Sequence, residues 1–526
     1  MNPDNLPDQP FGIISDLIHY HAGQQPEHAA VIQHERMLDY AAFNLLIDRV
    51  AAALQRDGLQ PGDALAICAA TSIEYAAVFL GGVRAGVAVA PLAPSSTAGS
   101  LAGMAMDAGV KLFFTDAAVA TELAPVADGI GAHLIALDDS TVGMRFTEWL
   151  APEDARPTPV TIEPEHPFNI IYSSGTTGLP KGIVQSHRMR WVHVQRGAAS
   201  GYGPQAVVLL STPLYSNTTL VSFFPTLTLG GTVVLMPKFD AGTYLTLAEK
   251  YRVTHTMLVP VQYQRLMAHP DFDKYDLSSF HLKFCTSAPF SAALKADILK
   301  RWPGGLVEYY GMTEGGGTCI LTAHEHPHKL HTVGCPAPGH DIRLIDDESR
   351  EVAPGKVGEV VGHSPAMMNA YHNQPVKTAE AEWHDATGKR FIRTGDIGLF
   401  DEDGFLTLLD RKKDMIISGG FNVYPSDLES VLQQHPDVVE ATVVGVPSVL
   451  WGETPVAFAV LKLGSQLSAK ALLEWTNKRL GKTQRLAAVE ILEMLPRSLI
   501  GKVLKRELRD SFQSGTLSPA PATGIV

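Results

Sequence analysis

The chain has 526 residues, of which 45% are hydrophobic and 18% are charged, and its formal net charge at pH 7 is −13. A chain of this length exceeds what one hydrophobic core usually serves, so we expect two or more domains. The acidic balance argues against a nucleic-acid-binding protein and against docking on anionic lipid, because both need a basic surface.

The cysteine pattern and the apolar runs indicate a soluble, cytoplasmic protein. None of the four cysteines, Cys68, Cys285, Cys319 and Cys335, has C-x-x-C spacing, which disfavours a disulfide framework or a zinc ribbon. Residues 1–8 are acidic and contain proline, unlike a signal peptide. No apolar run reaches the roughly 18 residues that a membrane-spanning helix requires.

The first part of the chain alternates between helical and extended patterns. Residues 11–54 carry apolar positions at helical spacing and are predicted to be helical. Strands are predicted at 64–68, 87–90 and 111–114, with helical segments between them. This alternation predicts layered α/β structure with a largely parallel sheet.

A glycine-rich loop follows at residues 172–182, Tyr-Ser-Ser-Gly-Thr-Thr-Gly-Leu-Pro-Lys-Gly, between two apolar segments. Its glycines allow close backbone approach, and turn N–H groups with hydroxyls and a lysine suit a polyphosphate. It is not a Walker A loop, because Pro180 precedes Lys181 and Gly182 follows it. From composition alone, a flexible linker is the alternative. The candidate phosphate-binding residues are Ser173, Ser174, Gly175, Thr176, Thr177, Gly178 and Lys181.

Further buried strands are predicted at 206–211, 232–236, 254–259 and 282–286. In open α/β sheets the loops that leave such strands line the ligand crevice. Candidate loops of this kind are 286–289 and 308–317.

The composition changes after about residue 334. Alternating segments at 341–345, 358–361 and 405–409 predict a small β-rich subdomain, which the charged junction 410–414 ends. A compact α+β unit is predicted next, with helices at 426–434 and 469–480 and strands at 438–446, 455–463 and 489–494. We expect domains at 1–410 and 411–510 and a disordered tail at 511–526.

Five motifs occur in one order along the chain: the loop at 172–182, Tyr310-Gly311-Met312-Thr313-Glu314, Arg393-Thr394-Gly395-Asp396, the Arg411 junction, and Pro-Arg-Ser-Leu-Ile-Gly-Lys at 496–502. In this order they resemble the acyl-adenylate-forming (AMP-binding) superfamily, in its acyl- and aryl-CoA ligase branch, and the resemblance extends from about Phe11 to Arg509. It implies an α/β fold with a large N-terminal domain of layered subdomains plus a small β-rich subdomain. A small, mobile α+β C-terminal domain would follow.

The resemblance also implies an ATP site with Mg²⁺. The loop residues and Lys181 would hold the β- and γ-phosphates, Thr313 would contact the α-phosphate, and Glu314 would bind Mg²⁺, a cation that favours carboxylate and phosphate oxygens. A carboxylate at a helix N-terminus is the alternative for Glu314. Tyr310 is expected to stack on adenine, with a core aromatic as its alternative. The other expected adenine contacts are Gly311 and Met312 beside it and Ser287, Ala288 and Pro289 on the other side. Asp396 would accept hydrogen bonds from the ribose hydroxyls, with a plain turn residue as its alternative, and Arg411 would contact ribose or phosphate.

Lys502 is implied as the catalytic cation of adenylation. A carboxylate must approach the α-phosphate there, and a compact positive charge can neutralise both anions. Lys413 would be the hinge about which the C-terminal domain rotates between half-reactions. Gly419 and Gly420 would then line a narrow channel for the coenzyme A thiol. The plainer alternatives are a solvated lysine for Lys502 and a simple turn for the glycines.

The acyl pocket is expected at Tyr215, Ser216 and Tyr309. Many relatives have an aromatic–histidine pair where this chain has Tyr215-Ser216, and a glycine or, in malonate ligases, an arginine where it has Tyr309. Tyrosine at 309 suggests a shorter or differently angled pocket, and the absence of arginine there disfavours a dicarboxylic acid. The absence of an aspartate near Ser216 disfavours an amino acid.

The sequence therefore predicts an ATP-dependent acid–CoA ligase that forms acyl-AMP and pyrophosphate and then acyl-CoA and AMP. Its alternatives are a stand-alone adenylating enzyme that loads a carrier protein and a non-catalytic nucleotide-binding paralogue. The expected partners are a small carboxylic acid, ATP and coenzyme A, with no nucleic acid and no membrane span, and with a homodimer as one assembly. A histidine-rich loop at 324–331 is interpreted as solvated rather than as a metal site.

Overall fold

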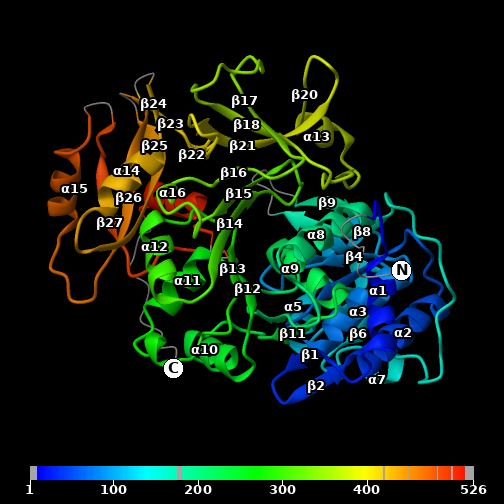
Figure 1. The fold of residues 1–526 in the computed structure, drawn as a ribbon. Helices are drawn as coiled ribbons and strands as arrows, with labels where there is room; N and C mark the ends of the chain where they lie inside the picture. The colour runs from blue at the N-terminus through cyan, green and yellow to red at the C-terminus, as the bar shows by residue number, and fades with distance from the viewer. Residues whose placement is uncertain are drawn as a thin grey trace. The chain divides into compact units, whose positions relative to one another are not determined.

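A computed structural model describes residues 9–173, 180–418, 421–448, 451–481, 484–498 and 502–515. The chain divides into two compact units (Figure 1). The first unit comprises Met1–Ile342 and Gly362–Ile392, and the second comprises Arg343–Val361 and Arg393–Val526. The expected domain boundary between residues 410 and 411 stays a prediction, because compactness alone does not locate a hinge.

Two large sheets form the frame of the first unit. One has the order β16-β15-β14-β13-β12-β10-β11-β1-β2, and its strands from β14 to β1 are parallel. The parallel centre confirms the predicted α/β layering. The bounds are Cys335–Pro336 (β16), Thr318–Thr322 (β15), Gly305–Gly311 (β14), Leu282–Cys285 (β13), His255–Leu258 (β12), Val207–Leu210 (β10), Thr232–Leu235 (β11), Ala29–Gln33 (β1) and Arg36–Asp39 (β2).

The other sheet has the order β19-β9-β8-β4-β3-β5-β6-β7, and it is parallel from β8 to β7. Its antiparallel pair β8–β9 carries the glycine-rich loop at its open end. The bounds are Ala370–Tyr371 (β19), Lys181–Ser186 (β9), Pro167–Ser173 (β8), Ala88–Pro91 (β4), Ala64–Cys68 (β3), Leu112–Thr115 (β5), His133–Ala136 (β6) and Met144–Arg145 (β7).

Helices join these strands, and most begin at a side chain that caps the first turn. Ser186, for example, accepts a hydrogen bond from the Met189 N–H at the start of α8. The helices of the first unit are Ile14–Gln24 (α1), Tyr40–Arg56 (α2), Ile73–Arg84 (α3), Ala98–Asp107 (α4), Ala117–Leu123 (α5), Ala127–Ile130 (α6), Phe146–Trp149 (α7), His187–Ala199 (α8), Asn217–Thr228 (α9), Ala241–Lys250 (α10), Pro260–Met267 (α11), Phe272–Lys274 (a 3-10 turn), Ala292–Arg301 (α12) and Pro375–Glu380 (α13).

The prediction of a helix throughout residues 11–54 is wrong in its middle, where β1 and β2 form a hairpin. The run Ala-Ala-Val-Ile-Gln of β1 is short and apolar, so its pattern does not distinguish a strand from a helix. Pairing with β11 decides the outcome. His34 makes the turn with φ of +54°.

A separate sheet has the order β17-β18-β21-β20, with β22 paired to β21. It contains the alternating segments expected of a β-rich subdomain. The bounds are Asp341–Ile345 (β17), Gly358–His363 (β18), Arg390–Phe400 (β21), Glu382–His384 (β20) and Leu406–Arg411 (β22).

The C-terminal part of the second unit is α+β, as predicted. Its sheet has the order β24-β23-β26-β25, with β27 paired to β26. Helix α16 continues to Ser514, past the expected start of a disordered tail at 511, because Phe512 packs on the apolar cluster around Phe458. The bounds are Phe421–Val423 (β24), Ile416–Ser418 (β23), Gly452–Leu461 (β26), Val438–Ser448 (β25), Ala488–Ile491 (β27), Pro425–Gln433 (α14), Ala469–Asn477 (α15) and Lys505–Ser514 (α16).

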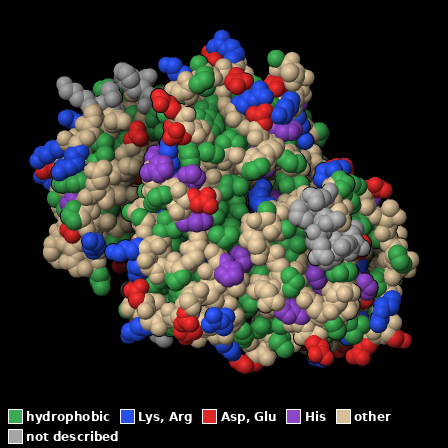
Figure 2. All heavy atoms as spheres, viewed as in Figure 1, with side chains coloured by type: hydrophobic (Ala, Val, Ile, Leu, Met, Phe, Trp, Pro, Cys, Tyr) green, Lys and Arg blue, Asp and Glu red, His purple; other side chains and the backbone are tan. Residues whose placement is uncertain are grey.

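The described surface mixes both signs of charge. On the face drawn in Figure 2, basic and acidic side chains are interspersed with hydrophobic ones. Among the described helices, none has the length and apolar character needed to cross a membrane.

Candidate active site

The strands that flank the glycine-rich loop fix its two ends. Ser173 closes β8 opposite Lys181, the first residue of β9. The Lys181 Nζ lies 4.2 Å from the ring centroid of Tyr371, within the range of a cation–π contact. The intervening candidates, Ser174, Gly175, Thr176, Thr177 and Gly178, lie outside the described residues.

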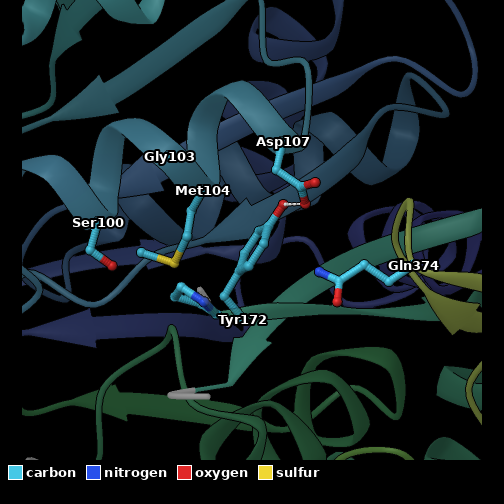
Figure 3. Close-up of a pocket in the computed structure, with 7 residues that line it drawn as sticks. Ser100, Gly103, Met104, Asp107, Tyr172 and Gln374 are labelled. Atoms are coloured by element: carbon cyan, nitrogen blue, oxygen red, sulfur yellow. Dashed lines mark hydrogen bonds between the residues drawn. The ribbon is translucent and has the colours of Figure 1, made fainter. Parts of the chain in front are cut away.

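A small pocket adjoins the ends of this loop, lined by Tyr172, Pro180, Gln374 and residues of α4 (Figure 3). Tyr172 donates its hydroxyl to Asp107 Oδ2 at 2.6 Å, as the dashed line in Figure 3 shows. Burial and the neighbouring carboxylate raise the pKa of Tyr172. The strand that leads into the loop is thus tied to the last residue of α4.

Glu314, the expected Mg²⁺ ligand, is oriented by a residue that the sequence analysis missed. The Tyr371 hydroxyl donates to Glu314 Oε1 at 2.8 Å, and the Met368 N–H donates to the Glu314 carbonyl at 2.8 Å. Burial and the Glu314 charge raise the pKa of Tyr371, which stays a donor. Tyr371 therefore contacts both Lys181 and Glu314. No motif marks it, because it lies on the short edge strand β19.

The backbone after Glu314 is packed too closely for any side chain. Gly315 has φ of +73°, and a Cβ there would lie 1.7 Å from the Ala366 carbonyl oxygen. A Cβ on Gly316 would lie 2.5 Å from Ile392 Cβ, and Gly317 has φ of +95°. These three glycines fix the course of the segment that holds Glu314.

Thr313 is linked to a buried network of amides around an arginine. Gln185 Nε2 donates to the Thr313 carbonyl at 2.7 Å. The guanidinium of Arg190, on α8, donates in turn to Gln185, to Asn169 and, at 2.9 Å, to Asn217 Oδ1. Arg190 is 0% exposed, and burial lowers its pKa to about 9. Its hydrogen-bond partners in the described structure are amide oxygens and Nδ1 of His193, so the charge has no carboxylate beside it.

The expected adenine segments lie at the ends of β13 and β14. Tyr310 and Gly311 close β14, and Met312 packs on the cluster of Ile183 and Met368. Ser287, which precedes Ala288 and Pro289, has φ of +81°, and its hydroxyl lies 2.6 Å from that of Thr218 on α9. This hydrogen bond connects an expected nucleotide loop with the helix that follows the expected acyl loop.

The expected acyl residues are buried to different extents. Ser216, directly before α9, is 8% exposed. Burial of the Tyr215 hydroxyl, and to a smaller extent the nearby Cys68 thiol, raises the pKa of Tyr215 to about 12. Tyr309 stacks on Phe284, with centroids 5.6 Å apart and an 18° interplanar angle. Arg196, which no motif singled out, places its Cζ 5.5 Å from the Tyr309 ring centroid.

The second unit gathers the remaining charged candidates. Asp396 pairs with Arg411 across β21 and β22, and Asp396 Oδ1 lies 2.9 Å from Arg411 Nε. Protein atoms around the Lys502 ammonium, followed by the charges of Arg411 and Lys413, lower its pKa to about 8. Desolvation also lowers the pKa of Lys413. Gly419 and Gly420 lie outside the described residues.

The donor set suits a metal ion held mainly by phosphate. Within the described residues there is no group of three or more His, Cys, Asp or Glu that could hold a metal alone. Tyr371 donates to Oε1 of Glu314 and thereby orients the carboxylate. One carboxylate completed by phosphate and water oxygens is how Mg²⁺ is usually bound.

Comparisons with known proteins match almost the whole chain. The model of the AMP-binding enzyme family matches residues 18–372, and that of the AMP-binding enzyme C-terminal domain matches residues 427–502. A fatty acid–[acyl-carrier-protein] ligase, ScoC, of Streptomyces coeruleorubidus is 33% identical over 94% of this chain and 95% of its own. An indoleacetate–CoA ligase of Aromatoleum aromaticum is 32% identical over 94% and 97%. The structure of ATP-bound MatB from Rhodopseudomonas palustris, 28% identical, covers 95% of this chain and 99% of its own with a TM-score of 0.85.

Proposed function

The chain belongs to the AMP-binding enzyme family, and on this premise we propose that it activates a carboxylic acid with ATP and passes the acyl group to coenzyme A. The carboxylate oxygen forms a bond to the α-phosphorus, and pyrophosphate leaves. The thiol sulfur then bonds to the acyl carbon of acyl-AMP, and AMP leaves with the electron pair of the broken C–O bond. The Glu314–Tyr371–Lys181 arrangement carries the proposal, because Tyr371 contacts both a carboxylate and a cation, the two groups that a Mg²⁺-bound phosphate chain requires.

The residues of the second unit support the first step of this scheme. A carboxylate and a phosphate repel each other, so a cation that meets both lowers the barrier to attack. We assign that role to Lys502. The Asp396 carboxylate, paired with Arg411, is assigned to the ribose hydroxyls, since a carboxylate accepts two hydrogen bonds and donates none.

The glycine-rich loop, Lys413, Gly419 and Gly420 keep the roles that the family resemblance implies. The loop would hold the departing pyrophosphate, Lys413 would be the hinge, and the two glycines would line the thiol channel. A cytoplasmic location is supported by four free cysteine thiols. We propose that the protein forms a homodimer and that it binds no nucleic acid.

The test measures release of pyrophosphate and formation of AMP over aliphatic, aromatic and dicarboxylic acids, with and without coenzyme A. We expect acid-dependent pyrophosphate release, and AMP release that coenzyme A accelerates. ATP binding without pyrophosphate release for any acid would contradict the proposal and favour a nucleotide-binding paralogue.

A carrier protein is the second candidate acceptor, since the relative ScoC is named as a ligase of fatty acid to acyl-carrier protein. The same assay separates the two acceptors when coenzyme A is replaced by a carrier protein with its pantetheine arm. Intact-mass measurement of an acylated carrier, with no acyl-CoA formed from free coenzyme A, would favour this second candidate.

A further inference from the structure

Arg196 lies in the last turn of α8 with its guanidinium beside the ring of Tyr309. Within the described residues it forms no ion pair, and its Cζ lies 5.5 Å from the Tyr309 ring centroid. Tyr309 itself is held on the other side by Phe284 and interacts with the Ser200 side chain. A tyrosine and an arginine from different elements thus share one partly enclosed site.

The groups packed around Arg196 add no negative charge. His193 and His340 are its histidine neighbours, and both stay neutral near pH 7, because burial and nearby cations lower their pKa values, that of His340 to about 4. His340 Nδ1 is occupied as an acceptor for the Thr318 N–H at 2.9 Å. The cluster of Arg196, Tyr309, His193 and His340 therefore carries one positive charge and no carboxylate.

Arg196 is half-buried, and a cation partly removed from water without a counter-ion is unfavourable. The carbonyl groups at the end of α8 offset part of that cost. Arg188 on the same helix pairs with Glu165, and the buried Arg190 donates to the amide oxygens of Gln185, Asn169 and Asn217. Among the described contacts Arg196 has no acceptor of either kind, which leaves its donors open to an anionic ligand.

The position of the cluster indicates which part of the substrate it would contact. Tyr309 immediately precedes Tyr310, an expected adenine contact, and α8 packs against α9, the helix that begins at the expected acyl loop. Figure 1 shows α8 and α9 side by side in the first unit. The cluster thus lies next to an expected adenine contact and on the helix that packs against the helix of the expected acyl loop.

We propose that Arg196 and Tyr309 form a subsite for a second anionic group on the substrate acid, remote from its reacting carboxylate, so that the preferred substrate is a dicarboxylic acid. This inference rests on the proposed acid-activating function. It reverses the expectation from position 309 alone, because the arginine comes from α8 rather than from β14. The guanidinium can donate two parallel hydrogen bonds to a carboxylate, and the phenol can donate a third.

The activity test compares a series of dicarboxylic acids with their half methyl esters, which keep length and shape but lose the second charge. For the wild type we expect a preference for the free dicarboxylic acid of about 10- to 100-fold in kcat/KM, the range of a charged hydrogen bond. Arg196→Gln should bring that ratio close to one through KM, and Arg196→Lys should restore part of it. Arg188→Gln, an exposed arginine on the same helix, is the matched control and should keep the wild-type ratio.

Isothermal titration with the same acids, without ATP, tests the subsite independently of turnover. Arg196-dependent binding without pyrophosphate release would support the subsite and contradict the proposed function. Turnover of monocarboxylic acids with no preference for the dicarboxylic ones, unchanged in Arg196→Gln, would overturn the subsite and leave the function standing. Equal binding of both acids by wild type and Arg196→Gln would also overturn it.

Discussion

The phosphate side and the acyl side of the first unit handle charge in opposite ways. Next to the glycine-rich loop, Lys181 and Glu314 each contact Tyr371, so each charge has a local partner. On α8, Arg190 and Arg196 are surrounded by neutral amides, histidines and rings. We propose that the phosphate side binds ATP, whose chemistry does not depend on which acid is activated. On the acyl side Arg190 is satisfied by buried amides, whereas we propose that Arg196 meets a charge on the substrate, and specificity is therefore expected to lie there.

The largest expected effect belongs to the nucleotide machinery. Lys502→Ala should lower formation of acyl-AMP by about 10²- to 10³-fold, the scale of losing a preorganised charge contact. It should leave thioester formation from supplied acyl-AMP nearly unchanged. Single-turnover measurements of both half-reactions check this, and an equal loss in the two would remove Lys502 from the adenylation step.

On the acyl side, the next largest effect should appear in stability. Arg190→Ala leaves the buried oxygens of Asn169 and Asn217 without their donor and opens a cavity, so the free energy of unfolding should fall by about 3 kcal/mol. Urea unfolding measures the change. Arg188→Ala is the control, and as a surface substitution it should shift the value by no more than about 0.5 kcal/mol. If both variants unfold at the same denaturant concentration, Arg190 is not a structural cation.

Tyr371→Phe isolates one hydrogen bond on the phosphate side. The phenylalanine ring keeps its contact with Lys181, while Glu314 loses the donor that orients it. We expect KM for ATP with Mg²⁺ to rise about tenfold, with kcat changed less, since hydrogen bonds to charged groups contribute about 1.5–3 kcal/mol. Titration of Mg²⁺ at fixed ATP should show the same shift. Wild-type Mg²⁺ dependence would show that Tyr371 does not orient the ligand.

The smallest expected effect is a pH dependence. The pKa of Lys502 is lowered from 10.5 to about 8. The amine therefore carries its positive charge below pH 8 and loses that charge as the pH rises through this value. Adenylation requires the charged form, and about half of kcat/KM should be lost near pH 8 relative to pH 7. Lys502→Arg should be slower, yet flat in this range. A wild-type profile that stays flat to pH 9 would contradict the assignment.

The nucleotide-side candidates can be named from the sequence because they lie in contiguous motifs, and their roles stay predictions. One short motif contains Tyr310 to Glu314, and another contains Thr394 and Asp396. Within each motif the backbone sets the geometry of the side chains. Tyr371 and Arg196 could not be found in this way, since each reaches the site from an element with no motif of its own. In the sequence Arg196 is an ordinary polar position on a helix, and only the fold brings its guanidinium to the Tyr309 ring on β14. The hairpin of β1 and β2 was missed for a related reason, because its partner β11 lies about 200 residues away in sequence.

The glycines at 315, 316 and 317 bear on how such an enzyme can be redesigned. A Cβ at Gly315 would meet a carbonyl oxygen at 1.7 Å, and Gly334 faces a comparable obstruction from Ile320 at 1.9 Å. Randomised libraries that include these positions would consist largely of misfolded members. Diversity is better directed at Arg196, Ser200 and Tyr309, where side chains rather than backbone set the available space. A laboratory lineage selected for new acids should accordingly accumulate its changes along α8 and leave the glycine triplet intact.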